Sequence, residues 1–193
     1  MMYKRTAMAR GGDFCTRAED GNLYIEGYFA VFGSRYELWD GAYETIEPGA
    51  FDGQTNRDVR ALVNHDTTLV LGRTTAGTLL LRVDERGLWG SIMINQQDQD
   101  AMNLYERVKR GDVNQCSFGF DILDQDVDYK DGVPTVWRIK AVKLYEVSVV
   151  TFPAYEDTSV EARRKDFEQA EKRRKEEWQA RMKSRLKGED NGT

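Results

Sequence analysis

The sequence of 193 residues contains few of the side chains that usually bind metals: one histidine, His65, and two cysteines, Cys15 and Cys116. A zinc site of the usual His/Cys kind would need every one of them at once, so we expect no metal and no cofactor. The two cysteines could form at most one disulfide bond. In a reducing compartment we expect two free thiols instead.

Long apolar runs are also missing. No stretch approaches the roughly 18 apolar residues of a membrane span, and the polar residues 1–5 lack the apolar core of a signal peptide. We therefore expect a protein without a membrane partner, in the cytoplasm of the cell that makes it.

Basic charge is scarce in most of the chain. The whole sequence has 28 Lys and Arg against 33 Asp and Glu, whereas residues 161–193 have 11 against 8. Residues 1–160 therefore carry a net charge of −8, which argues against nucleic acid as a partner, because nucleic-acid-binding faces need clustered basic residues. There is also no glycine-rich phosphate loop and no Gly-x-Ser-x-Gly elbow, which disfavours nucleotide-driven chemistry and the α/β-hydrolase arrangement.

Alternating apolar and polar residues predict about seven or eight short strands. They cover residues 23–32, 59–65, 69–72, 78–83, 88–95, 114–123, 136–139 and 141–151. One helix is expected over residues 98–109, and a second, highly charged helix over 161–187. This excess of strands favours a mainly β fold, a barrel or a sandwich with a helix packed on it.

The composition divides the chain into three parts. Residues 1–21 are expected to be a flexible N-terminal arm or a short edge strand, residues 22–160 one folded domain, and residues 161–193 a charged helical tail. Within the domain, the acidic residues 124–132 are expected to form a surface excursion.

Three polar side chains each lie in an apolar, strand-like run: His65, Ser117 and Glu146. A polar group in such a run costs free energy unless it has a partner. If these three are partners of one another, they form a nucleophile (Ser117), a base (His65) and the group that orients the base (Glu146). The alternatives are a histidine satisfied within the core and a glutamate paired with a basic residue.

Strand alternation gives each candidate a face. We expect His65 on the apolar face of the strand at residues 59–65. Ser117 faces away from Cys116, and Gly119 leaves room beside the hydroxyl for a peptide. Because Cys116 shares the bulky apolar face, the alternative of a cysteine hydrolase is disfavoured.

Four stretches, in the expected order over residues 22–157, resemble the prohead, or capsid-maturation, serine proteases of tailed bacteriophages, which are related to the herpesvirus assemblins. They are residues 27–33 (GYFAVFG), 46–51 (IEPGAF), 62–66 (LVNHD) with 71–73 (LGR), and 116–120 (CSFGF) with 144–154 (LYEVSVVTFPA).

The resemblance implies the same three roles, with His65 as base, Ser117 as nucleophile and Glu146 at the position of the acid. The herpesvirus relatives use a second histidine there, which this chain lacks. The resemblance also implies a closed, assemblin-like β-barrel flanked by helices, a shallow peptide groove, and an oxyanion hole made by backbone N–H groups near residues 151–154.

The function implied is that of a serine endopeptidase of the Ser-His-Glu type, packaged inside the phage procapsid in the host cytoplasm. Its partners would be the scaffold-like extension of the major capsid protein, any internal scaffold, and the chain itself through autoproteolysis. The tail would be either a tether into the shell that is later self-cleaved or merely a solvated helix. The competing function is a non-catalytic capsid assembly or scaffolding protein with the same barrel.

Overall fold

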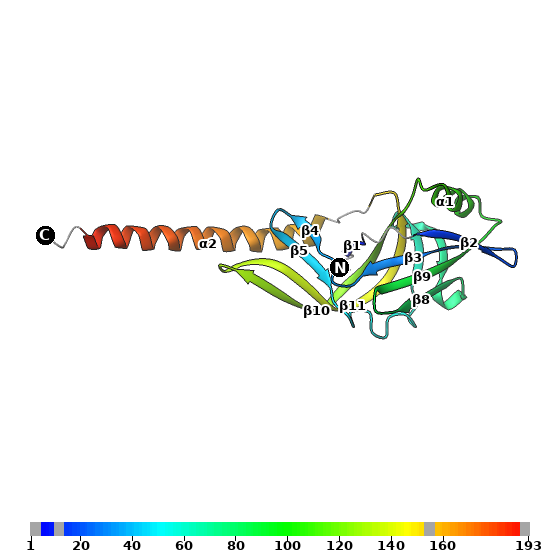
Figure 1. The fold of residues 1–193 in the computed structure, drawn as a ribbon, viewed down its shortest axis with the longest axis horizontal. Helices are drawn as coiled ribbons and strands as arrows, with labels where there is room; N and C mark the ends of the chain where they lie inside the picture. The colour runs from blue at the N-terminus through cyan, green and yellow to red at the C-terminus, as the bar shows by residue number, and fades with distance from the viewer. Residues whose placement is uncertain (1–4, 10–13, 153–156, 190–193) are drawn as a thin grey trace.

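The computed structural model describes residues 5–9, 14–152 and 157–189 (Figure 1). Its strands are β1 (Arg5–Ala9), β2 (Cys15–Glu19), β3 (Asn22–Val31), β4 (Tyr36–Trp39), β5 (Ala42–Ile46), β6 (Arg60–Val63), β7 (Asp66–Arg73), β8 (Leu79–Val83), β9 (Gly87–Ile94), β10 (Gln115–Lys130) and β11 (Val133–Val150). Its helices are α1 (Gln99–Arg110), α2 (Asp157–Glu189) and the short 3₁₀ helix η1 (Thr74–Ala76). Within these residues the chain is mainly β with two α-helices, as predicted.

The strands form two sheets. The larger sheet has the order β1-β10-β11-β5-β4, and β6 and β7 extend it from the second half of β11. The smaller sheet has the order β2-β3-β9-β8, and all its pairs are antiparallel. Among the described residues the pairing leaves both sheets with open edges, so the prediction of a closed barrel is wrong. One reason is that β11 pairs with two different strands along its length. Residues 136–139 bond to β5 and residues 146–149 bond to β6, so the sheet branches at β11.

The two sheets share one apolar core. Phe118 and Phe120 of the larger sheet and Phe29 and Ile92 of the smaller sheet are fully buried in the same cluster. The Phe118 ring stacks on Phe120 with 4.8 Å between ring centroids, and it meets Phe51 edge-on at 5.4 Å. β10 thus contributes two aromatic side chains of its apolar face to the core.

The helix α1 begins and ends where its sequence predicts. The side chain of Asp98 accepts hydrogen bonds from the backbone N–H groups of Asp100 and Ala101, which caps the first turn. Gly111 follows the last turn with a left-handed φ of 86°, a conformation that glycine adopts without steric cost.

The N-terminal segment differs from the flexible arm expected there. In its described part, β1 pairs with β10 and β2 pairs with β3. Both strands lie at sheet edges, which is the alternative that the sequence left open for residues 1–21.

The segment at residues 124–132 is not an irregular excursion but the end of a long hairpin between β10 and β11. Three of its acidic side chains, Asp124, Asp126 and Asp128, have basic partners on the opposite strand. Asp124 pairs with Lys140 at 3.3 Å, and Asp128 pairs with Arg138 at 2.7 Å. Such cross-strand pairs stabilise a solvated two-stranded ribbon that apolar periodicity does not reveal.

The helix α2 extends past the tip of the β10–β11 hairpin and away from the sheets (Figure 1). Its first half packs on the domain. The Phe167 ring lies 5.6 Å from the Trp39 ring, which in turn lies 5.7 Å from Trp137, and Ala170 is buried. Neither α-helix, over the residues described, is both long and apolar enough to cross a membrane.

Candidate active site

Two adjacent strands of the larger sheet carry Ser117 and Glu146. β10 and β11 run antiparallel, with Ser117 opposite Ser148 and Gly119 opposite Glu146. Residues directly opposite each other, and residues two apart on one strand, have their side chains on the same face. The two serines and the carboxylate therefore lie on one face of the sheet, where all three are buried.

The third candidate, His65, lies in a turn and not in the expected strand. β6 ends at Val63, and Asn64 and His65 form a two-residue connection to β7 with φ values of 49° and 60°. The prediction that His65 continues the apolar face of residues 59–65 is therefore wrong, because the backbone reverses before it. The turn still places the imidazole at β11, since β6 runs parallel beside residues 146–149.

The imidazole and the carboxylate are in direct contact. Nδ1 of His65 lies 2.7 Å from Oε1 of Glu146, with the two side chains 12% and 3% exposed. An ionised carboxylate can only accept, so this contact assigns the hydrogen to Nδ1, and in the corresponding neutral tautomer Nε2 is an acceptor. Nε2 is buried and has no hydrogen-bond partner among the described residues. A histidine that is satisfied within the core would not leave this nitrogen unpaired.

Ser148 completes the contacts of the carboxylate. Its hydroxyl donates to Oε2 of Glu146 at 2.7 Å and accepts the backbone N–H of His65 at 3.3 Å. Both carboxylate oxygens thus have partners within the site, His65 and Ser148. The alternative that Glu146 forms an ion pair with a lysine or arginine is therefore not supported. Ser148 was not among the predicted site residues. The available signal was its spacing, because residues 146 and 148 share one face of a strand.

Ser117 is fully buried beside this cluster. It faces Ser148 across the strand pair, and opposite residues have Cβ atoms about 4.5–5.5 Å apart. The hydroxyl and the imidazole therefore lie on the same side of the sheet. Since Nε2 has no partner, the Ser117 hydroxyl does not bond to it in this structure.

Gly119 makes room for the acid and not for a peptide, which corrects the expectation for this position. A Cβ atom at residue 119 would lie 3.0 Å from both Cγ and Cδ of Glu146 and closer still to Oε1. The space beside the glycine is thus already occupied by the carboxylate.

Cys116 and Asp66, the sequence neighbours of Ser117 and His65, take no part in this cluster. Cys116 is buried on the core face, where its thiol donates to the backbone oxygen of Tyr28 at 3.1 Å. Both cysteines are free thiols. Asp66 accepts hydrogen bonds from the N–H and hydroxyl of Thr68. No group of three or more His, Cys, Asp or Glu side chains in the described part of the chain is arranged to bind a metal ion.

The predicted oxyanion region lies partly outside the described residues, which exclude 153–156. The N–H of Thr151 donates to Oδ1 of Asn64 at 2.9 Å, so it is already engaged. Asn64 and Thr151 also border a cavity of about 340 Å³ between the His65 turn, α1 and the end of β11.

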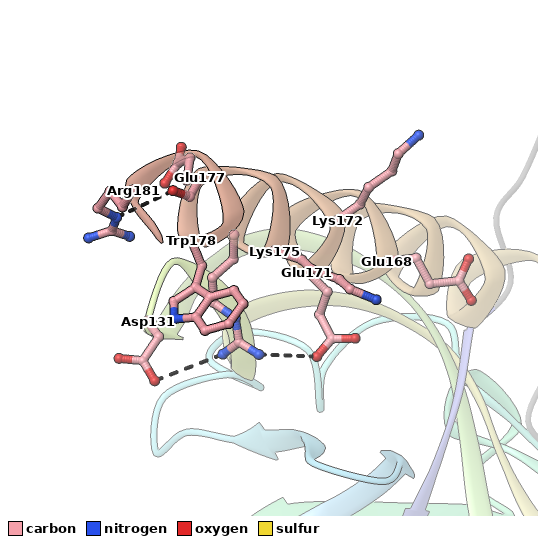
Figure 2. Close-up of a pocket in the computed structure, with 9 residues that line it drawn as sticks. Asp131, Glu168, Glu171, Lys172, Lys175, Glu177, Trp178 and Arg181 are labelled. Carbon is pink, nitrogen blue, oxygen red and sulfur yellow. Dashed lines mark hydrogen bonds and ion pairs between the residues drawn. The ribbon is translucent and has the colours of Figure 1, made fainter. Parts of the chain in front are cut away.

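A larger cavity of about 970 Å³ lies away from this cluster, between α2 and the tip of the hairpin (Figure 2). It contains none of the candidate residues. Its lining is formed by Asp131, Glu168, Glu171, Lys172, Arg174, Lys175, Glu177, Trp178 and Arg181.

The chain is similar to several proteins of tailed bacteriophages. A family described as caudovirus prohead serine protease matches residues 13–173. The prohead protease of Enterobacteria phage HK97 is 32% identical over 149 residues, which cover 74% of this chain and 61% of that protein's length. Among solved structures, the bacteriophage T4 capsid assembly protease gp21 is similar with a TM-score of 0.44 and 12% identity, over 77% of this chain and 96% of that chain.

Proposed function

Because the chain belongs to the caudovirus prohead serine protease family, we propose that it is a serine endopeptidase that acts in head maturation, with Ser117, His65 and Glu146 as its catalytic residues. The observation that carries the proposal is the state of the imidazole. Its Nδ1 contacts a buried carboxylate and its Nε2 has no partner among the described residues, next to β11, where Ser148 lies opposite Ser117.

In the proposed reaction, Nε2 of His65 takes the proton of the Ser117 hydroxyl as Oγ attacks the carbonyl carbon of the scissile peptide. Glu146 keeps the ring in orientation and stabilises the imidazolium that forms. The tetrahedral intermediate then collapses as His65 returns the proton to the leaving amine, and an ester to Ser117 remains. Water hydrolyses this ester by the same proton transfers in the second half of the reaction.

Ser117 must become accessible for this chemistry, because it is fully buried in the free chain. Catalytic hydrogen bonds are often long or absent without substrate and form when the substrate binds. The proposal therefore includes a rearrangement around β10 that brings Oγ to Nε2 when a peptide enters.

For substrates, we propose the scaffold-like extension of the major capsid protein, any internal scaffold, and the chain itself, inside the procapsid. These come from the family resemblance. The tail fits a tether that brings the enzyme into the shell, since residues 161–193 carry a net charge of +3 against −8 for the remainder.

The decisive variant is Ser117→Ala, with Ser91→Ala as its matched control. Ser91 is likewise a buried serine in a strand, but it lies in the smaller sheet, where its hydroxyl donates to Glu26. Loss of the nucleophile costs up to ~10⁶ in turnover. We expect Ser117→Ala to lose cleavage of co-assembled capsid protein, measured by mass spectrometry, with an unchanged circular dichroism spectrum, and Ser91→Ala to keep cleavage. Cleavage by Ser117→Ala at the wild-type rate would remove this serine as nucleophile.

The complete burial of Ser117 also favours a second candidate, a non-catalytic assembly protein with the same fold. The two candidates differ in the fate of the purified chain. A protease loses a C-terminal fragment progressively in the wild type and not in Ser117→Ala, whereas an assembly protein keeps a constant mass in both.

A further inference from the structure

We infer that Ser148 is a positioning residue, which fixes both the carboxylate of Glu146 and the backbone of His65 and so holds the base in its working orientation. The inference rests on the proposed function and assigns a role in it to a residue that touches no reacting atom.

The geometry gives the Ser148 hydroxyl two simultaneous bonds. It donates its only proton to Oε2 of Glu146 at 2.7 Å and accepts the N–H of His65 at 3.3 Å. It therefore links the carboxylate to the backbone of the residue whose ring that carboxylate holds. The result is a closed set of three contacts, in which Oε1 binds Nδ1 and Oε2 is bound from the other side.

The two bonds stabilise an unfavourable backbone conformation at His65 and a buried carboxylate oxygen of Glu146 that needs a donor. His65 has a φ of 60°, a left-handed conformation that is unfavourable for a residue with a Cβ atom, and the bond to Ser148 anchors it to β11. The Glu146 carboxylate is 3% exposed, so without Ser148 its Oε2 would be buried with no donor that the described contacts supply. It could then rotate and release Nδ1.

Ser148 is a poorer candidate for the nucleophile than Ser117, although the two face each other across the strand pair. The proton of Ser148 is already committed to Glu146, and its hydroxyl has no bond to Nε2, which is unpaired.

The test compares Ser148→Ala, which removes the hydroxyl, with Ser148→Thr, which keeps it, and with Ser91→Ala as control. Misplacement of a catalytic group and loss of a charge-assisted hydrogen bond each reduce rates by about 10- to 100-fold. We expect Ser148→Ala to lower kcat by about this factor with little change in KM, Ser148→Thr to recover most of it, and Ser91→Ala to match the wild type.

A second test, NMR spectroscopy of the His65 imidazole, does not depend on activity. Since His65 is the only histidine, ¹⁵N-histidine labelling gives one imidazole signal set in the full chain. In a Ser117→Ala background, which prevents self-cleavage, we expect a slowly exchanging Nδ1–H proton. Adding Ser148→Ala should make this proton exchange faster and mix the two ring tautomers, whereas adding Ser91→Ala should not.

Ser148→Cys covers the case in which Ser148→Ala does not fold, because a thiol fills the same space and is a weaker donor. An unchanged imidazole spectrum and an unchanged kcat in folded Ser148→Ala, or in Ser148→Cys if Ser148→Ala does not fold, would overturn the inference. If Ser117→Ala still cleaves, the proposed function fails instead, and the spectra continue to report whether Ser148 positions His65.

Discussion

At residue 119, the absence of a side chain decides whether the candidate acid fits. A methyl group there would lie 3.0 Å from Cγ and Cδ of Glu146 and would displace its carboxylate from His65. Overpacking of this kind in a core costs about 1–3 kcal/mol. We expect Gly119→Ala to lower the free energy of unfolding by that amount in urea denaturation and to lose cleavage activity.

Gly27→Ala is the control for this substitution. Its added Cβ would lie 3.0 Å from the ring of Phe14, in the smaller sheet and away from Glu146. It should lose stability without losing cleavage. If Gly119→Ala kept full activity at reduced stability, the carboxylate would not need its present position.

The candidate residues could be selected from the sequence because each is a polar group in an apolar run. His65, Ser117 and Glu146 stood out for this reason, and their clustering on one side of the larger sheet follows from strand pairing. Ser148 could not be selected in this way, since a serine in a strand is common. Its proposed positioning role depends on two specific hydrogen bonds. Rotamers and bond partners of this kind have no periodic signal.

At the scale of the element, the turn between β6 and β7 is the least predictable part of the site. Alternation predicted the strand but carried it two residues too far, to His65. Two consecutive left-handed residues form the tight turn favoured in hairpins, yet neither is glycine, so the usual sequence signal was absent. The choice between a barrel and two sheets is likewise not predictable from alternation, because it depends on which distant strands pair with β11.

The Asn64 side of this turn gives a prediction with an internal control. Asn64→Ala and Asn64→Gly both remove the acceptor for the Thr151 N–H, but only alanine resists the φ of 49°. A left-handed residue with a Cβ atom costs about 1–2 kcal/mol. We expect Asn64→Ala to be less stable than Asn64→Gly by that amount in urea denaturation, and to cleave more slowly because the turn positions His65. Equal stability of the two variants would show that the turn relaxes without strain.

At the scale of the whole molecule, α2 is divided between a packed half and an extended half. Phe167 and Ala170 pack on the domain. Arg174 pairs with Asp131 at the hairpin tip at 3.9 Å and with Glu171 on its own helix at 3.6 Å, and Figure 2 shows a dashed line ending at each of these two acidic side chains. Beyond this contact Trp178 is 58% exposed. The tail is therefore not a uniform appendage, and its two halves should respond differently to removal.

Two truncations separate the halves. Deletion of residues 176–193 removes only the extended part, so we expect Tm to change by about 1 °C or less, within the small effect of surface changes. Deletion of residues 161–193 also removes Phe167 and uncovers Trp39. The loss of a partly buried aromatic side chain costs about 1–2 kcal/mol, which corresponds to a fall in Tm of about 2–6 °C. Because both truncations lack Trp178, a red shift of tryptophan fluorescence in the longer deletion alone would report the exposure of Trp39.

The same two chains test the tether. If the extended half directs the enzyme into the shell, deletion of residues 176–193 abolishes entry into procapsids, measured by mass spectrometry of purified particles, while Tm and peptide cleavage in solution stay at wild-type values. Residues 176–193 contain four Lys and Arg and four Asp and Glu, but all four basic residues lie within residues 178–188, a stretch without an acidic residue that could contact an acidic partner. Normal packaging of the shorter chain would leave α2 beyond Arg174 as a solvated helix and would assign any remaining role to the half that packs on Trp39.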